Sequence, residues 1–472
     1  MTWRCCGQIF AGCWSGVTSR IFFALYVNIY SQTQEAIKMS YYQSFMGFAL
    51  LLLLPFAASA EPLSLQQAVR RTVEHNPMLA ESRAAAAVAE QGIKTAQGRH
   101  LPRLSLEASI TQRSESTAFI PAQSATVPPR FSDSYAFLGP VLTLPLYQGG
   151  QVQAAVRLAE VRHAMQQDSV VITRNELIAN TVATYAKYLQ LQTLVAASSR
   201  ALEALNRQRK DARLKFDLGR IARVDLLKVE VQQANEEQRL LALQEGLNNA
   251  GSALRSLMGE AVGPTDRPLQ LADRLQPQEL QPDFTAGLAL AKSKPKFQLH
   301  AKGVADAAFN RTIALGKLLP SLQATAGYQQ QLGFNPHFSD GVWYVGGALS
   351  LPLFDRSSYA ELSRQRLQQQ RAEQKLRAVE QQIRLDLLQA SSSIIESRKR
   401  ISATSLAVEQ ASESFRIEQQ KFSEGAGTMA DLLLAQSAEA QAVANHTQAL
   451  FDQTVAVLNW HKASGNMEVY LQ

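Results

Sequence analysis

Four short segments of the chain alternate apolar residues with polar or small ones at every second position. The first runs from Leu104 to Ile110, where leucine, alanine and isoleucine are separated by serine and glutamate. The pattern recurs over residues 136–144, 322–328 and 343–351. A period of two is typical of strands with one apolar face. The sequence therefore predicts four β-strands of roughly ten residues each, arranged as two pairs.

The longer segments between these strands carry a different period. Apolar residues in them follow a four-then-three spacing, which is typical of helices that pack along a seam. The positions are Ile178, Val182, Tyr185 and Leu189 in the first half of the chain, and Ile383, Leu387, Ala390, Ile394 and Ile401 in the second. We interpret these stripes as packing seams rather than cofactor sites.

The same pattern predicts six helices, two of which are about twice as long as the others. They are Leu65–His100, Tyr147–Phe216, Val224–Met258, Phe284–Leu318, Asp355–Phe422 and Ala430–Ser464. In each half, the two shorter helices together match the long one in length, so we expect them to lie end to end beside it. The long helices would extend for roughly 100 Å at ~1.5 Å per residue.

The chain contains two copies of one half-molecule. The segment Lys215-Phe216-Asp217-Leu218-Gly219 recurs 206 residues later (421 − 215) as Lys421-Phe422-Ser423-Glu424-Gly425. The same offset relates Asp225-Leu226-Leu227 to Asp431-Leu432-Leu433, and Leu144-Pro145-Leu146-Tyr147 has a counterpart in Leu351-Pro352-Leu353-Phe354. A period of about 200 residues is far longer than a solenoid unit, so it indicates a duplicated half-molecule.

This duplication predicts the domain organisation of a mainly α protein with some β structure. The first repeat would cover residues 61–268 and the second residues 284–472, each with a helix, a strand pair, a long helix and a further helix. Residues 269–283 would form a linker that runs beside the helices at mid-length. The Pro-containing stretch between the first two strands accounts for the extra length of the first repeat.

The N-terminal sixty residues have the features of a leader. An apolar run from Phe45 to Phe56 ends in Ala58-Ser59-Ala60, which fits a signal-peptidase site, and the run is too short to span a membrane. We expect cleavage after Ala60, a start at Met39 and a mis-assigned extension over residues 1–38. All three cysteines precede Met39: Cys5, Cys6 and Cys13. Their position excludes disulfides, thiolate sites and acylation of an N-terminal cysteine from the expected mature chain.

Charge and motif content argue against several classes of function. The mature part has 44 basic and 39 acidic residues (47 − 3 and 40 − 1), and they are dispersed, so nucleic-acid binding has no support. No histidine pair has the spacing of a zinc motif, and neither a phosphate-binding glycine loop nor a nucleophile elbow occurs. We predict no enzymatic activity, no cofactor and no metal site.

The predicted strands have the length and alternation that cross the wall of an outer-membrane barrel. Four strands cannot close a barrel, because about eight are needed to fill even a small one. An open strand edge in lipid would leave backbone groups unpaired at a cost of several kcal/mol each. Several chains would therefore share one barrel, and the strand pattern leaves two, three or four copies open.

The chain resembles the outer-membrane efflux proteins of the TolC family over residues 61–472. The shared features are Leu63-Ser64-Leu65-Gln66-Gln67-Ala68, Asn76-Pro77, the two Leu-Pro-Leu-aromatic strand ends, and the Phe-x-x-Gly turns at Phe216 and Phe422. The resemblance implies a homotrimer in the outer membrane: a barrel of twelve strands, four from each chain, continued by a helical barrel across the periplasm. It also implies passive conduction of small molecules, with energy from an inner-membrane transporter joined through a periplasmic adaptor protein.

The resemblance further implies that the two Gly turns are the periplasmic tips where the adaptor docks and the channel closes. The docking candidates are Phe216, Gly219, Asp225, Leu226, Phe422, Gly425, Asp431 and Leu432. Asp431 also matches an acidic ring at the mouth of family members, where like charges would favour cations. Gly427 and Leu434 stand where an arginine latch and a second aspartate occur in the family, which puts a charge-latched gate in doubt. Asp225 and Asp431 also fit an ordinary role as helix-start residues.

Two other functions remain open at this point. The chain could be the outer-membrane channel of a type I protein secretion system, because the pump rather than the channel selects the cargo. It could also be a periplasmic coiled-coil structural or adaptor protein without a pore. The latter would extract from cells as a soluble protein, whereas a channel would sediment with outer membranes and need detergent for release.

Overall fold

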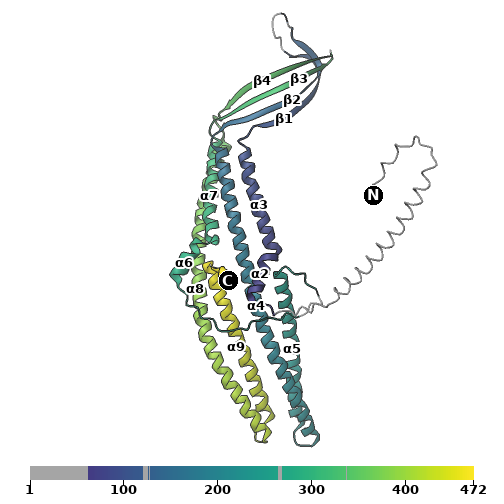
Figure 1. Ribbon diagram of the computed structural model, residues 1–472, viewed down its shortest axis with the longest axis vertical. Helices are drawn as coiled ribbons and strands as arrows, with labels where there is room; N and C mark the ends of the chain where they lie inside the picture. Colours follow the sequence, from purple (N-terminus) through teal and green to yellow (C-terminus); the bar gives the residue numbers. More distant parts are fainter. Residues whose placement is uncertain (1–61, 121–125, 127, 264–267, 336, 472) are drawn as a thin grey trace, which may run out of the picture. The chain divides into compact units, whose positions relative to one another are not determined.

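The computed structural model describes residues 62–120, 126, 128–263, 268–335 and 337–471. The expected leader, the alternative start at Met39 and the three cysteines lie outside these residues. The elements are α2 (Leu65–His75), α3 (Pro77–Gly98), β1 (Arg103–Ile120), β2 (Arg130–Gln148), α4 (Gln151–Asp217), α5 (Arg223–Leu257), α6 (Phe284–Ser293), α7 (Pro295–Gly316), β3 (Ser321–Phe334), β4 (His337–Ser350), α8 (Arg356–Ser423), α9 (Met429–Ser464) and the 3-10 turn η1 (Met467–Tyr470) (Figure 1).

The four strands form one antiparallel sheet in the order β1-β2-β3-β4. The central pairing of β2 with β3 joins the strand pairs of the two repeats. The outer edges of β1 and β4 pair with no other strand among the described residues. The mainly helical fold with four strands per chain is thus confirmed, and each strand pair comes from one repeat.

The strands are longer than the alternation predicted. They have 18, 19, 14 and 14 residues instead of roughly ten. Beyond Thr111, β1 continues to Ile120 through the polar stretch from Gln112 to Thr117, in which no apolar alternation marks a strand. Its backbone pairs with β2 at Gln112, opposite Ser134, and again from Thr117, opposite Ser132, to Ile120, opposite Arg130, with register shifts after Gln112 and after Ala118.

One face of the sheet is apolar and exposed. Leu104 lies opposite Leu142, Leu142 opposite Ala326, and Ala326 opposite Val345, so one apolar row crosses all four strands. Leu104 and Val345 are 70% and 72% exposed. The other face carries serine, threonine and glutamine between aromatic residues. It includes Tyr344, whose ring covers the position opposite at Gly327.

The predicted first helix of each repeat is wrong as a single element. Leu65–His100 and Phe284–Leu318 are each divided into two helices. The first divides between α2 and α3 at Asn76-Pro77, and the second between α6 and α7 at Lys294-Pro295. Proline lacks the N–H that a helix interior needs and forces the preceding residue into an extended conformation. Asn76 compensates, since its side chain accepts from the Met78 N–H at 2.9 Å and donates to the Leu257 carbonyl at 2.8 Å.

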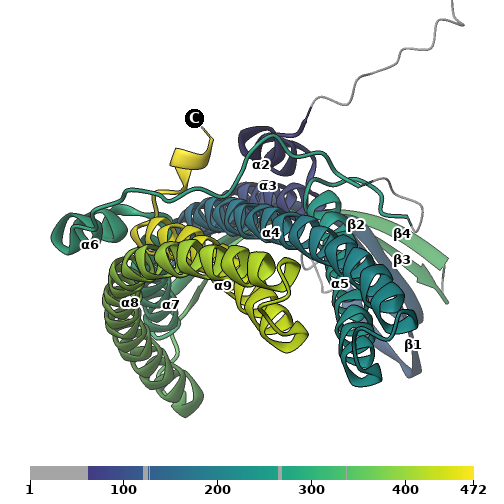
Figure 2. The same ribbon diagram turned by 90° about the horizontal axis from the view of Figure 1, so that it is seen from below.

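The long helices α4 and α8 have 67 and 68 residues. Helices α3 and α5 pack along α4, and α7 and α9 pack along α8, which confirms the expected end-to-end arrangement. Seen along their length, the helices lie in an arc that runs from α8 through α9 and α4 to α5 (Figure 2). Helices α2 and α6 and the C-terminal residues lie on the convex side of this arc.

The buried core is concentrated at mid-length. Tyr185 and Leu189 of α4 pack with Leu63, Leu254 and the linker residue Leu271, while Ile383, Leu387 and Ile394 of α8 pack with Trp460 of α9. Leu269, Leu271 and Leu275 therefore pack against the helices at mid-length. The Tyr185 hydroxyl donates to Asp273 at 2.7 Å. Burial and this hydrogen bond raise the pKa of Tyr185 above its usual range.

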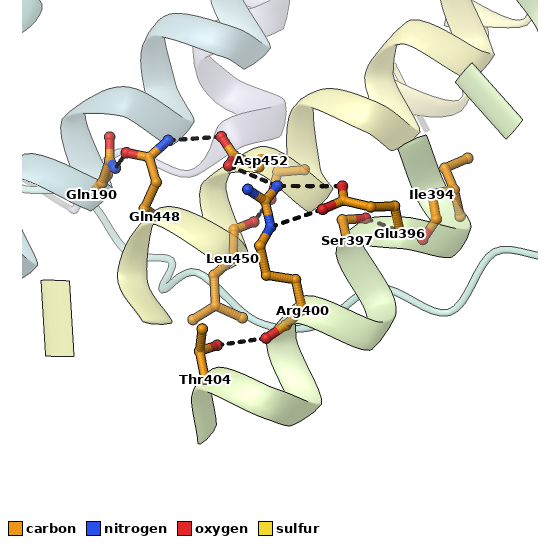
Figure 3. A network of polar contacts seen from close by, with 10 residues as sticks. Gln190, Ile394, Glu396, Ser397, Arg400, Thr404, Gln448, Leu450 and Asp452 are labelled. Carbon is orange, nitrogen blue, oxygen red and sulfur yellow. Dashed lines mark hydrogen bonds and ion pairs between the residues drawn. The ribbon is translucent and has the colours of Figure 1, made fainter. Parts of the chain in front are cut away.

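A chain of polar contacts joins three helices near mid-length (Figure 3). The buried Gln190 of α4 donates to Gln448 of α9 at 2.6 Å, and Gln448 donates to Asp452 at 2.7 Å. Asp452 pairs with Arg400 of α8 at 2.9 Å, and Arg400 also pairs with Glu396 at 3.4 Å. Because a buried amide is costly when unpaired, these contacts fix how the hairpin of α8 and α9 lies against α4.

Candidate functional site

The two hairpin turns lie at the end of the helices opposite the sheet (Figure 1). Each is built by the same device. Gly219 and Gly425 have φ values of 69° and 78°, in the left-handed region that glycine adopts without a steric penalty. The N–H of each following residue reaches back to the last helical turn: Arg220 to the Lys215 carbonyl at 2.8 Å, and Ala426 to the Lys421 carbonyl at 2.9 Å.

A hydrophobic cluster packs the two turns against each other. Its buried members are Ala212 of α4, Leu226 and Val229 of α5, and Met429 and Leu432 of α9. Phe216, Ile221, Phe415, Phe422 and Leu433 pack around it. The two halves of the duplicated turn motif thus meet in one core.

The predicted docking residues consequently have different environments. Leu226 and Leu432 are only 4% and 2% exposed, so they hold the tips together and do not present a surface to a partner. Phe216 and Phe422 are half-buried on the same cluster, and Lys215 lies 4.5 Å from the Phe422 ring centroid. Asp225, Gly219, Gly425 and Asp431 remain accessible at the tips.

The two aspartates stand in the first turns of α5 and α9. Asp431 makes a reciprocal cap with Thr428: its backbone N–H donates to the threonine oxygen at 3.2 Å, and its carboxylate accepts the threonine hydroxyl at 2.6 Å. At the equivalent place before α5 stands Ala222, which has no side-chain cap, and Asp225 pairs instead with Lys228 at 3.3 Å. Asp431 therefore has the ordinary role of a helix-start residue. Its carboxylate accepts this one hydrogen bond and remains exposed to solvent.

A groove between α5 and α9 is the feature of the tips that the sequence interpretation missed. It has a volume of about 520 Å³. Its walls are repeat-equivalent residues, each pair 206 apart (430 − 224): Val224 with Ala430, Leu227 with Leu433, Lys228 with Leu434, and Val231 with Ser437. The signal was present in α5, where Val224, Leu227 and Val231 follow the spacing of one helix face, yet they are 46–61% exposed.

Neither a metal centre nor an apolar membrane-spanning helix is found among the residues that the structure describes. Among the described residues, no three histidine, cysteine, aspartate or glutamate side chains gather closely enough to hold a metal ion. The helices within 62–471 all lack an apolar stretch of the length that crosses a bilayer.

Comparison with known proteins identifies the family. The sequence profile of the family described as outer membrane efflux protein matches residues 68–260 and 288–466, which is most of the chain. The chain is 24% identical over 391 residues to the outer membrane efflux protein BepC of Brucella suis, covering 80% of this chain and 82% of BepC. It is also 24% identical over 322 residues to the cobalt-zinc-cadmium resistance protein CzcC of Cupriavidus metallidurans, covering 67% of this chain and 69% of CzcC.

Solved structures show the same fold. The outer membrane protein VceC of Vibrio cholerae superposes with a TM-score of 0.72 at 21% identity, covering 85% of this chain and 96% of VceC. The CmeC outer membrane channel of Campylobacter jejuni gives a TM-score of 0.74 at 16% identity, with 85% of each chain covered. The profile match and these folds confirm the TolC-type resemblance, and the family consists of transport components rather than enzymes. The chain is therefore a member of the outer membrane efflux protein family and belongs to the outer membrane.

Proposed function

We propose that this protein is the outer-membrane channel of a tripartite efflux system, through which small molecules pass passively from the periplasm or a pump to the exterior. Three copies would assemble, and their sheets would close into one barrel of twelve strands. The arc of helices in each copy would continue this barrel as a wall across the periplasm. The names of BepC and CzcC, an efflux protein and a metal resistance protein, support an export role.

The observation that carries the proposal is a sheet with one exposed apolar face and two edges that no described strand covers. In lipid, each unpaired backbone group costs several kcal/mol, so a four-stranded sheet cannot be stable there alone. The edge of β1 in one copy and the edge of β4 in the next supply each other's partners when the ring closes. The apolar row from Leu104 to Val345 then faces acyl chains, and the polar and aromatic face lines the lumen.

The hairpin tips would form the periplasmic mouth and the docking site. An adaptor protein would bind there and connect the channel to an inner-membrane transporter. Asp431 is exposed at the tip, and three copies would bring three of its carboxylates around one axis. Like charges around a narrow mouth favour cations.

The decisive experiment uses the full chain purified from outer membranes in detergent. We expect a particle of three copies by sedimentation, substantial sheet signal in circular dichroism, and discrete conductance steps in planar lipid bilayers. A water-soluble monomer that forms no pores would overturn the proposal and favour the coiled-coil alternative.

The gate assignment has its own test in the same bilayers. Asp431→Asn should lower the preference for cations over anions and change the single-channel conductance, because it removes the ring of charge. Asp225→Asn is the matched control at the repeat-equivalent position, paired with Lys228, and should have the smaller effect. If Asp431→Asn conducts with unaltered size and selectivity, Asp431 is a helix cap only.

A further inference from the structure

A cavity lies between the α4–α5 hairpin and the α8–α9 hairpin, next to the cluster that joins their tips. Its volume is about 310 Å³, and all four helices contribute to its walls. Phe415 lines it and also packs on the tip cluster, which places the two side by side. We call this space the hairpin cavity. Its size is at the lower end of the range for small-molecule sites, and much of its wall is alanine: Ala197, Ala201, Ala204 and Ala440.

One wall of the hairpin cavity carries a buried carboxylate. Glu236 of α5 is only 6% exposed, and it accepts the hydroxyl hydrogen of the buried Ser198 of α4. The nearest cation is Arg239, whose Nη1 lies 4.0 Å from the carboxylate, which is too far for a hydrogen bond. An ionised carboxylate can accept several hydrogen bonds, and its burial is costly unless it is paired. Glu236 therefore has acceptor capacity that the described residues leave unused.

The duplication indicates that helix packing does not require this carboxylate. The residue 206 positions later (442 − 236) is Ala442 of α9, which is also buried, at 9% exposure. Alanine thus fills the equivalent place in the second hairpin. Acidic side chains are seldom buried without a partner, so Glu236 is the position at which the two hairpins differ in chemistry rather than in packing.

The other hairpin contributes an unpaired amide to the same cavity. Gln436 of α9 is 8% exposed, and its Oε1 atom is buried without a hydrogen-bond partner among the described residues. Gln453, farther along α9, shows the usual state of a buried amide. It is 1% exposed, and both ends of its side chain bond to the backbone of Gln278, at 2.9 and 3.0 Å. An unpaired buried acceptor is unfavourable, and a ligand with a hydrogen-bond donor would relieve that cost.

The positive charges of the hairpin cavity lie on its solvent side. The Arg239 side chain is 39% exposed, and Arg200 is exposed and donates to a carbonyl of its own helix at 3.2 Å. The second acid, Glu439, already accepts a serine hydroxyl of α8 at 2.9 Å. Water and salt screen exposed charges far more than buried ones. In the buried part of the cavity, the oxygens of Glu236 and Gln436 are therefore the groups that lack a donor.

We propose that the hairpin cavity binds a primary ammonium group carried on a short apolar chain. An ammonium has three N–H donors, so it can donate to the Glu236 carboxylate and to Gln436 Oε1 while its chain lies against the alanines. A neutral hydroxyl has one donor and no charge to set against the buried carboxylate. Because Glu236 belongs to α5 and Gln436 to α9, the bound group would join the two hairpins. The site does not depend on the proposed channel function.

The test uses the full chain purified in detergent, with butylammonium as the probe and butanol as its uncharged counterpart. Titrations followed by saturation-transfer NMR give the dissociation constant of each. We expect butylammonium to bind at least ~10-fold more tightly, because a hydrogen bond to a charged group contributes at least that factor. Equal binding of the two probes, or no saturable binding of butylammonium, would overturn the proposal.

Two variants with the same change of charge locate the site. Glu236→Gln keeps the shape of the side chain and should weaken binding of butylammonium by at least ~10-fold. Glu237→Gln changes the next residue of α5, which is exposed, and should leave the dissociation constant unaltered. Uptake of the probes by detergent is common to all variants, so it cannot produce this difference. Unaltered binding in Glu236→Gln, or equal losses in the two variants, would contradict the assignment.

Thermal unfolding without the probe tests the unpaired amide separately from binding. Gln436→Leu should weaken butylammonium binding by ~5-fold or more and yet raise the unfolding midpoint, because it removes a buried acceptor that has no partner. Gln453→Leu should lower the midpoint, since it breaks two hydrogen bonds, and should leave binding intact. A lowered midpoint for Gln436→Leu would show that its amide is already paired in the unliganded protein, and would overturn the site.

Discussion

At the scale of single residues, backbone conformation at glycine decides where the helices end. Gly219 and Gly425 turn the hairpins, and Gly259 and Gly465 end α5 and α9, all with φ between 69° and 78°. The four positions form two pairs at the offset of the duplication. The two repeats therefore share both the hairpin turn and the helix end.

Replacing Gly425 with alanine should destabilise the protein by about 1–2 kcal/mol, because an L-residue in the left-handed region brings its Cβ against the next carbonyl. Apart from the glycine itself and its two chain neighbours, a Cβ at Gly425 would meet no atom within 4 Å, so the cost reports the backbone alone. Gly303, inside α7 and equally free of neighbours, is the control: Gly303→Ala should stabilise by about 0.5–1 kcal/mol. Thermal unfolding in detergent measures both, and an unaltered midpoint for Gly425→Ala would contradict the turn geometry.

His461 should make stability depend on pH. Burial lowers the pKa of His461, whose ring meets the Tyr470 ring edge-on at 5.7 Å. The unfolded chain therefore takes up a proton first, near pH 6.5, and the folded state loses stability as the pH falls below that value. Between pH 7 and pH 5, the midpoint temperature of unfolding should fall less for the neutral variant His461→Gln than for the parent protein. Parallel pH profiles of the two proteins would exclude this role.

At the scale of elements, the buried seams along the long helices carry the packing energy. The breaks between α2 and α3 and between α6 and α7 lie at prolines. Neighbouring positions of one helix can differ completely in burial, as Leu387 and Leu388 do at 0% and 52% exposure. The position on the seam therefore predicts the energetic role better than the residue type.

Leu387→Ala should cost about 2–5 kcal/mol, since it opens a cavity among Ile383, Trp460 and their neighbours. Leu388→Ala, one position along α8, should change stability by less than about 1 kcal/mol, because a half-exposed leucine loses little on truncation. Unfolding midpoints of both variants and the parent protein decide the matter. Similar losses for the two variants would show that the seam is placed wrongly.

The sequence predicted those features that depend on local pattern. The helix seams at Ile178 and Ile383 and the turns at Gly219 and Gly425 follow from spacing and glycine alone. The break at Pro77 was missed because the helical pattern continues across it. The end of β1 was missed because the polar stretch from Gln112 to Thr117 interrupts the apolar alternation before Ala118 and Ile120.

Features that depend on two distant segments were out of reach. The burial of Leu226 and Leu432 arises only when the two turns pack on each other, and a sequence pattern cannot show which of several leucines faces that contact. The groove has the same origin, because α5 and α9 each contribute one wall.

At the scale of the whole molecule, the sheet favours assembly with other copies of the same chain. Its apolar face and free edges are unfavourable in water and incomplete in lipid. The helices need no such completion at mid-length, where buried clusters and the contacts around Arg400 already join α4, α8 and α9.

Lysine on the lipid-facing side of the sheet should disrupt membrane assembly. Val345→Lys places a charge on the exposed apolar face at a cost of about 2–4 kcal/mol near the bilayer midplane. Thr325→Lys, on β3 one residue before the partner of Val345, points to the opposite face and should be tolerated. The amount of trimer in outer-membrane fractions measures both. Equal amounts for the two variants would mean that the faces are assigned the wrong way round.

The unequal strand lengths of the two repeats have a consequence for the outer end of the proposed barrel. The last residue pair in the register between β2 and β3 is Tyr135 with Gly333, while β1 and β2 remain paired with each other as far as Ile120 and Arg130. In a ring of three copies, the longer strand pair β1–β2 would alternate with the shorter pair β3–β4. The extracellular rim would then have three raised lobes. A molecule that binds the channel from outside would find three equivalent binding surfaces there.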